Sequence, residues 1–280
     1  MDSNMLQNKA RRLLDLHKAP PILLLPNAWD AASARIFEAS GFPAIATSSA
    51  AIANSLGYPD GQAIPRAEML FMIERIARAV SVPVTADMEA GYSTTPEGAA
   101  ETALAVIAAG AVGMNFEDST GDPAAPLFDL SLQVERIKAI RSACASSGVP
   151  FFLNARTDVY LEEVGEPATR FDHAVRRANA YRQAGADCLF VPGVADRDVI
   201  VRLVAAIHGP INILITTAPT LPPVPELERL GVARVSVGSG PHRATMALTR
   251  RIAKELLATG TYSSFTVDTI PYAEANNLFK

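Results

Sequence analysis

The sequence of 280 residues predicts an α/β fold, a single TIM-type (β/α)₈ barrel. Eight short apolar runs alternate with helical patterns along the chain, and the composition does not break between them. Several helical stretches end on a glycine just before the next apolar run, as expected for a left-handed helix cap. These glycines are Gly41, Gly110, Gly148, Gly185 and Gly231.

The apolar runs are interpreted as the strands of the barrel. In chain order they are PILLLPNAW, PAIATSSA, VPVTADMEA, VGMNFED, VPFFLNARTD, CLFVPG, INILIT and RVSVG. Between them lie helical patterns such as PRAEMLFMIERIARAV and PEGAAETALAVIAAGA. The alternative is an open dinucleotide-binding sheet. It would require G-x-G-x-x-G after the first strand, where this chain reads LLLPNAWDAASA.

Two segments flank the predicted barrel, which covers residues 20–258. The N-terminal segment, 1–19, is an amphipathic helix ending near His17, and we expect it to cover the bottom of the barrel. The C-terminal tail, 259–280, carries aromatic residues expected to dock on the body or on a neighbouring subunit. These are Tyr262, Phe265, Tyr272 and Phe279.

Composition excludes several classes of partner. The formal net charge of -4 is too small to indicate binding to nucleic acid or to an anionic membrane. Cys144 and Cys188 have neither metal-ligand spacing nor a disulfide framework. There is no apolar signal core at the N-terminus and no run of roughly 18 apolar residues. We therefore expect a cytoplasmic protein that acts on a small molecule, with its scattered arginines on solvated helix faces, Arg156 excepted.

Acidic residues gather at the ends of the third and fourth strands. Asp87 and Glu89 are two apart, which places side chains of one strand on one face, and Glu117 ends the next strand. Three ionised carboxylates at one point would raise one another's pKa values. A divalent cation would compensate them, and oxygen ligands without His or Cys favour Mg²⁺ or Mn²⁺. We predict Asp87, Glu89 and Glu117 as metal ligands, some through water; the alternative role for such acids is to cap helices.

Arg156 lies at the end of the fifth strand, in NARTD. It either forms a salt bridge to Asp158 or to the acid cluster, or it is a fork that binds a substrate carboxylate and offsets charge on a developing enolate. Ser48 and Ser49 follow the second strand and either donate to the same carboxylate or cap a helix.

Two residue types that other mechanisms would need do not end a strand. None of the lysines does so, which argues against Schiff-base aldolase chemistry. Of the histidines, only His242 follows a strand, in the loop after the eighth. A metal-plus-arginine enolate mechanism remains.

Five segments, ATSSA, LGYPDG, TADMEAGY, NFEDS and NARTD, occur in this order. At these residues the sequence resembles the isocitrate lyase/phosphoenolpyruvate mutase superfamily, from about Pro21 to Ala258. The resemblance implies a Mg²⁺-dependent barrel that binds a 2-oxo acid or its enolate. It also implies that Asp87 touches the metal, while Glu89 and Glu117 hold its waters.

The same resemblance implies further site residues. Asp60 would lie beside the reacting group, and Ser48 and Ser49 would form the carboxylate-binding turn. Arg156, Asp60 and Glu117 would be catalytic, and Tyr58 would contact the substrate. Retro-aldol cleavage of a malate-like acid would need an additional base, for which Tyr58, Tyr92 and His242 are unranked candidates. Members of the superfamily typically form tetramers in which paired subunits exchange their last barrel helix, so a homodimer or homotetramer is expected.

The loop after the fourth strand departs from the superfamily pattern. It reads EDSTGDPAAPLFDLS, without the Lys-Lys/Arg-Cys-Gly-His stretch of isocitrate and methylisocitrate lyases and without the mutase lysine. The expected function is a Mg²⁺-dependent carbon–carbon lyase for a small 2-oxo or 2-hydroxy dicarboxylate. It would be oxaloacetate decarboxylase-like or a methylisocitrate/malate-type lyase. The alternatives are a phosphoenolpyruvate mutase or phosphonopyruvate hydrolase, and a non-catalytic 2-oxo acid binding protein.

Overall fold

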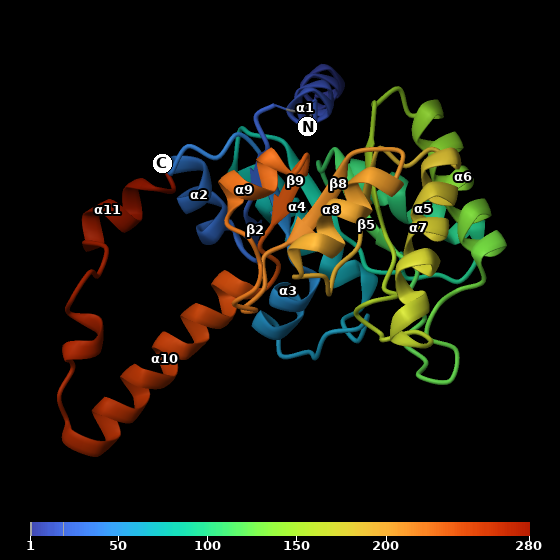
Figure 1. Ribbon diagram of the computed structural model, residues 1–280. Helices are drawn as coiled ribbons and strands as arrows, with labels where there is room; N and C mark the ends of the chain where they lie inside the picture. Colours follow the sequence, from blue (N-terminus) through green and yellow to red (C-terminus); the bar gives the residue numbers. More distant parts are fainter. Residues whose placement is uncertain (1, 19) are drawn as a thin grey trace.

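A closed barrel of parallel strands forms the body of the protein, in a computed structural model that describes residues 2–18 and 20–280 (Figure 1). The strands are β1 (Leu23–Leu25), β2 (Asn27–Ala28), β3 (Ile45–Thr47), β4 (Val84–Asp87), β5 (Gly113–Glu117), β6 (Phe152–Arg156), β7 (Cys188–Phe190), β8 (Ile211–Leu214) and β9 (Arg234–Ser236). β1 pairs with β9, and β2 pairs with β3. Because β1 and β2 are the two halves of the first predicted strand, interrupted at Pro26, they close the ring and confirm the predicted barrel.

Helices surround this ring. They are α1 (Ser3–Leu16), α2 (Ala31–Ala39), α3 (Ser49–Ser55), α4 (Arg66–Ala79), α5 (Pro96–Ala108), α6 (Leu130–Ser146), α7 (Pro167–Gln183), α8 (Arg197–Ala206), α9 (Val224–Arg229), α10 (Gly240–Thr259), the 3₁₀ turn η1 (Ser263–Phe265) and α11 (Tyr272–Asn277). The apolar core lies between strands and helices, where Ile73, Val106 and Ile137 are fully buried. The glycines predicted to cap helices all have positive φ, for example 95° at Gly110. Thr95 caps α5 ahead of Pro96.

Helix α1 covers the N-terminal end of the barrel, as the sequence predicted. Its Leu13 is fully buried, and a Cβ placed on Gly113 of β5 would lie 3.2 Å from the Leu13 side chain. The same Cβ would lie 2.7 Å from the Phe152 carbonyl oxygen of β6, so this position requires glycine. The His17 ring stacks on Phe152 with a centroid distance of 3.8 Å. The expected limits of this segment at positions 1 and 19 lie outside the described residues.

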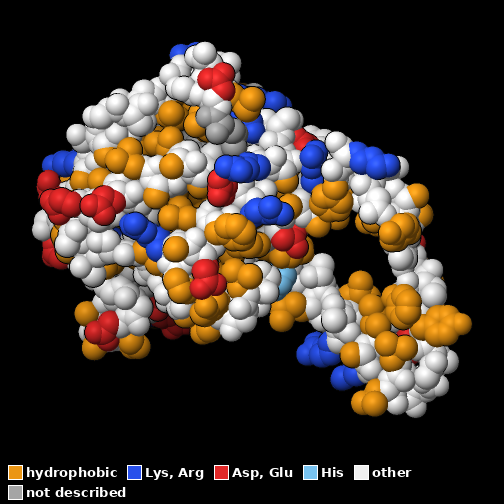
Figure 2. Space-filling model, turned by 180° about the vertical axis from the view of Figure 1, so that it is seen from behind, with side chains coloured by type: hydrophobic (Ala, Val, Ile, Leu, Met, Phe, Trp, Pro, Cys, Tyr) orange, Lys and Arg blue, Asp and Glu red, His pale blue; other side chains and the backbone are white. Residues whose placement is uncertain are grey.

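Helix α10 and the tail extend away from the barrel (Figure 1), and Figure 2 shows them as an arm held off the body. Apolar side chains on this arm face solvent: Leu257 is 91% exposed and Tyr272 is 86% exposed. The end of the chain returns to the body, where Phe279 lines a surface pocket together with Phe71 of α4 and Arg35 of α2.

No helix in the described part of the chain is both long and apolar enough to cross a membrane.

Candidate active site

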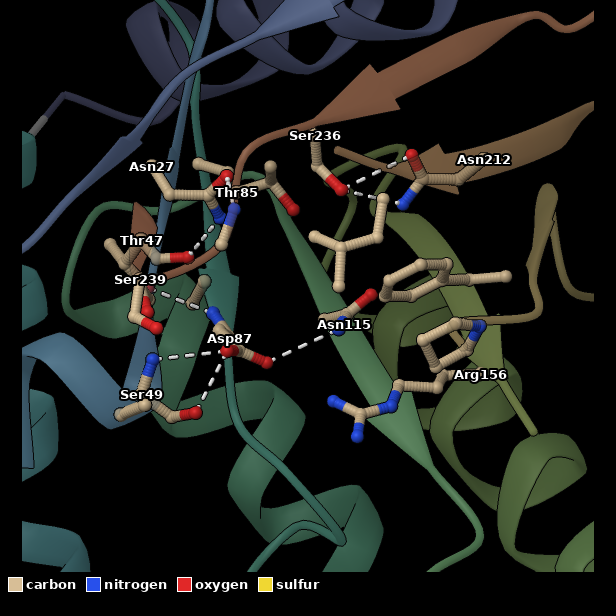
Figure 3. A pocket seen from close by; sticks show the side chains of 18 of the residues that line it. Asn27, Thr47, Ser49, Thr85, Asp87, Asn115, Arg156, Asn212, Ser236 and Ser239 are labelled. Carbon is tan, nitrogen blue, oxygen red and sulfur yellow. Dashed lines mark hydrogen bonds between the residues drawn. The ribbon is translucent and has the colours of Figure 1, made fainter. Parts of the chain in front are cut away.

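A cavity of about 170 Å³ opens at the ends of the strands (Figure 3). Every strand position around the ring contributes to its wall. The lining residues from the ring include Asn27, Ala46, Asp87, Asn115, Arg156, Phe190, Leu214 and Ser236. Five of the predicted site residues also line it: Ser48, Ser49, Asp60, Asp87 and Arg156. These five residues, which the sequence placed near separate strand ends, therefore meet at one cavity, whereas Glu89, Glu117 and Tyr58 are not among its lining residues.

Asp87, the last residue of β4, is held by donors from two neighbouring elements (Figure 3). Its Oδ2 accepts from the backbone N–H of Ser49 at 3.0 Å and from the Ser49 hydroxyl at 2.8 Å. Its Oδ1 accepts from Asn115 Nδ2 at 3.2 Å, and Asn154 in turn donates to Asn115 at 2.5 Å. These bonds fix the carboxylate while leaving lone pairs for a further ligand.

The two serines after β3 have different roles in the structure. Ser48 is the N-cap of α3, and its hydroxyl accepts from the Ala51 N–H at 3.3 Å. Ser49 directs both of its donors at Asp87. The first serine thus has the capping role considered from the sequence, and the second positions the predicted metal ligand.

Glu89 lies beyond the end of β4, so the alternation of strand side chains does not place it. Its φ of 50° is left-handed, as are those of Gly91 and Tyr92, and the turn directs the Glu89 carboxylate toward the Gln62 N–H at 2.6 Å. A Cβ on Gly91 would meet the Phe116 ring at 2.8 Å, so this tight turn requires a glycine there. Burial, together with the nearby Asp87 and then Asp60, raises the pKa of Glu89 to about 8.

Arg156 joins two carboxylates at the edge of the cavity. Its Nη1 lies 2.8 Å from Glu117 Oε2, and its Nε donates to Asp158 Oδ1 at 2.6 Å. Burial lowers the pKa of Arg156, but Asp158 and Glu117 outweigh it, so the guanidinium stays charged. Burial also raises the pKa of Glu117, against the opposing effect of Arg156. The ion pair considered from the sequence is present, and the guanidinium still faces the cavity.

Several buried oxygen atoms near Asp87 lack a hydrogen-bond partner in the described chain. They are Glu89 Oε1, Glu117 Oε2 and the Tyr92 hydroxyl; the approach of Arg156 to Glu117 is close but does not have hydrogen-bond geometry. Within residues 2–18 and 20–280, no three His, Cys, Asp or Glu side chains are grouped as direct ligands of one ion. The donor set fits a hard cation that touches one carboxylate and reaches the others through water. The metal ligands remain a prediction.

The other predicted residues are spread more widely. Asp60 lines the cavity, and loss of solvent around its carboxylate together with Asp87 raises its pKa. Tyr58 does not line the cavity, and its hydroxyl donates to Glu68 at 3.1 Å. His242 is buried against Trp29, 5.1 Å between ring centroids, and does not line the cavity either.

The expectation that arginines other than Arg156 lie on solvated helix faces is wrong for Arg136, which is fully buried on α6. Its Nη2 donates to the Ala90 carbonyl and, at 2.7 Å, to the Ser93 carbonyl, which holds the turn after β4. The rings of Phe116 and Phe128 lie 4.7 and 4.1 Å from its guanidinium carbon. No local signal marks this arginine, because its helical sequence pattern matches that of an exposed face.

Comparison with known proteins gives consistent matches. The family model of phosphoenolpyruvate phosphomutase matches residues 13–257. An uncharacterized protein of Mycobacterium tuberculosis strain H37Rv is 36% identical over 230 residues, covering 82% of this chain and 83% of that protein. An oxaloacetate decarboxylase of Rhodopseudomonas palustris strain BisB5 is 31% identical over 242 residues, covering 83% and 78%. The crystal structure of a candidate lyase/mutase from Burkholderia cenocepacia J2315 superposes with a TM-score of 0.92 at 37% identity, covering 99% and 97%.

Proposed function

Since the chain belongs to the phosphoenolpyruvate mutase/isocitrate lyase superfamily, we propose that it is a Mg²⁺-dependent carbon–carbon lyase for a small 2-oxo or 2-hydroxy dicarboxylate. The observation that carries this proposal is that Asp87 and Arg156 line one cavity, with Glu117 paired to the arginine. A relative named as an oxaloacetate decarboxylase makes oxaloacetate the first substrate to test.

The residues of the cavity divide the work between binding and charge stabilisation. Asp87 would hold the ion directly, with Glu89 and Glu117 toward its waters; Mn²⁺ is the alternative ion. When bound, the metal supplies Lewis-acid polarisation of the 2-oxo group. Arg156 binds the adjacent carboxylate and offsets the negative charge that develops on the C2 oxygen. In oxaloacetate the C3–C4 bond breaks, CO₂ leaves, and the electron pair forms the pyruvate enolate, which is then protonated at C3.

Carbon–phosphorus chemistry on phosphonopyruvate is the second candidate. Asp60 supports it, because this carboxylate reaches the same cavity as Asp87 and would lie beside a reacting group. A third candidate is a 2-oxo acid binding protein without turnover, for which the loop after β5 is the reason: it carries no Cys, Lys or His between Glu117 and Asp129.

One panel separates the three candidates. The purified protein is incubated with Mg²⁺ and oxaloacetate, methylisocitrate, dimethylmalate or phosphonopyruvate. We expect pyruvate from oxaloacetate, abolished by EDTA and by Asp87→Ala. Inorganic phosphate from phosphonopyruvate would instead favour the second candidate. Absence of turnover with all four, combined with a rise in melting temperature on adding 2-oxo acids, would favour the binding protein.

From the same family membership we also propose that the protein forms an oligomer. The arm formed by α10 and the tail leaves apolar side chains such as Leu257 and Tyr272 in solvent. In a homodimer or homotetramer that exchanges this helix, a neighbouring barrel would cover them. The division into barrel 20–258 and flanking segments belongs to this proposal.

A further inference from the structure

Arg234 occupies an unusual position at the floor of the cavity. It is the first residue of β9 and pairs in register with Leu23 and Asn212, so it lies deeper than Ser236 of the same strand. Arg234 is only 2% exposed, yet it lines the cavity. Its Nε and Nη1 are buried without a hydrogen-bond partner among the described residues. Buried donors without an acceptor require an oxygen atom from a bound water or a ligand.

The charge of Arg234 is not balanced by its surroundings. Burial lowers its pKa to about 10, so the guanidinium is still charged at neutral pH. Of the groups that face it, the Cys188 thiol has a pKa raised by burial to about 12, and His17 has a pKa lowered by burial to about 3, so both are neutral. Asp87 is the acid that acts on it, without forming an ion pair. By contrast, Arg156 pairs directly with two carboxylates.

The wall around the Arg234 guanidinium is also polar. TIM barrels usually fill their interior with bulky branched side chains. Here Asn212 and Ser236 face each other at 3.2 Å. Among the described residues, the Thr85 hydroxyl is also a buried donor without a partner. A charged guanidinium with unpaired N–H donors can bind a carboxylate through charge-assisted hydrogen bonds.

We propose that Arg234 is a specificity-determining residue that binds the second carboxylate of a dicarboxylate ligand at the floor of the cavity. The inference rests on the proposed function, in which Asp87 and Arg156 hold the 2-oxo or 2-hydroxy acid end nearer the mouth. A dianion placed between these groups supplies both the missing hydrogen-bond acceptors and the missing negative charge. Ordered water would supply acceptors but would leave the buried charge unbalanced.

Calorimetric titration with a matched ligand pair tests this. L-Malate and L-2-hydroxybutyrate share a four-carbon 2-hydroxy acid, and the second has a methyl group in place of the second carboxylate. With Mg²⁺ present, we expect the wild-type protein to bind malate about 10- to 100-fold more tightly, as for a charge-assisted hydrogen bond. Arg234→Met should remove this preference and leave the affinity for 2-hydroxybutyrate within about twofold. Arg243→Met, on the exposed face of α10, is the control and should keep the preference.

The outcomes separate the inference from the proposed function. Equal affinity of the wild-type protein for both ligands, or a malate preference that survives in Arg234→Met, would overturn the role of Arg234 while leaving the lyase proposal in place. Equal weakening of both ligands in Arg234→Met would show a structural role and overturn it as well. Failure of both ligands to bind the wild-type protein would overturn both proposals. Arg234→Lys keeps the charge but not the planar set of N–H donors, so a partial preference is expected from it even if Arg234→Met does not fold.

Discussion

Two buried ion networks meet at the end of β5, one inside the barrel and one outside it. Glu117 and Asp118 are consecutive, so their side chains leave the sheet on opposite faces. Outside, Asp118 Oδ2 accepts from the Tyr181 hydroxyl at 2.6 Å and from Arg177 Nη1 at 3.1 Å. Inside, Glu117 contacts Arg156, but its Oε2 has no hydrogen bond within the described residues.

The difference separates an arrangement that stabilises the fold from one that we propose binds a ligand. A buried polar network is stabilising when each of its atoms is paired, and the outer network meets this condition at Asp118. Its other oxygen, Oδ1, accepts from the Asp158 N–H at 2.9 Å. The inner network has burial without full pairing, and burial raises the pKa of Glu117. The same residue types, one position apart, therefore predict opposite responses to substitution.

Glu117→Gln should give the largest effect, and on activity rather than on stability. Removing the carboxylate takes away a group proposed to hold the metal's waters, so we expect kcat/KM to fall about 10²- to 10³-fold. The free energy of unfolding should change by less than about 1 kcal/mol, because glutamine has the shape of glutamate and Arg156 keeps its ion pair with Asp158. Steady-state kinetics measure kcat/KM, and urea unfolding measures the free energy of unfolding. A variant that loses stability but keeps its activity would break the comparison.

Asp118→Asn should show the reverse pattern. It leaves the Arg177 guanidinium without its carboxylate in a buried site, which costs about 3 to 5 kcal/mol of unfolding free energy. Activity per folded molecule should be nearly unchanged, since the Asp118 side chain pairs with Arg177 and Tyr181 of α7, on the outside of the barrel. Asp172→Asn, at an exposed position of α7, is the control and should stay within about 0.5 kcal/mol of the wild type. A loss of activity larger than the loss of folded protein would contradict the assignment.

His17 tests whether acid sensitivity arises outside both networks. Burial and then Arg234 lower its pKa from 6.5 to about 3, so between these values the folded protein binds fewer protons than the unfolded chain. The free energy of unfolding therefore keeps its full value with respect to His17 above pH 6.5 and decreases as the pH falls, by about 2 kcal/mol at pH 5. In His17→Gln, the difference in unfolding free energy between pH 7 and pH 5 should be smaller than in the wild type by this amount. His208→Gln, at an exposed position, should retain the wild-type difference; an unchanged difference in His17→Gln would refute the prediction.

The sequence predicted what depends on local pattern. Alternating apolar runs and terminal glycines were enough for the barrel, and Asp87, Ser49 and Arg156 could be placed at its mouth because parallel strands end together. Glu89 was placed at the right end of the barrel but by the wrong rule, because its left-handed φ depends on the packing of Gly91 against Phe116.

Residues whose role depends on contacts distant in sequence were not predicted. Arg136 and Arg177 have the sequence pattern of exposed helix residues, and the segments that bury them come from elsewhere in the chain. The polar barrel interior is likewise assembled from single residues, such as Asn154 and Asn212, in otherwise apolar strands. Their burial follows from ring closure, which local patterns do not encode.

Pairing of Leu23 with Arg234 means that the ring is completed by residues from the two ends of the barrel sequence. During synthesis at about 5 to 20 residues per second, β1 emerges about 10 to 40 s before its partner β9 exists. Its open edge must stay unpaired, or be shielded, for that interval. Arg234, at the floor of the cavity, belongs to β9, the strand that closes the ring. A nascent chain has therefore synthesised the acidic residues of the site before the pocket can be complete.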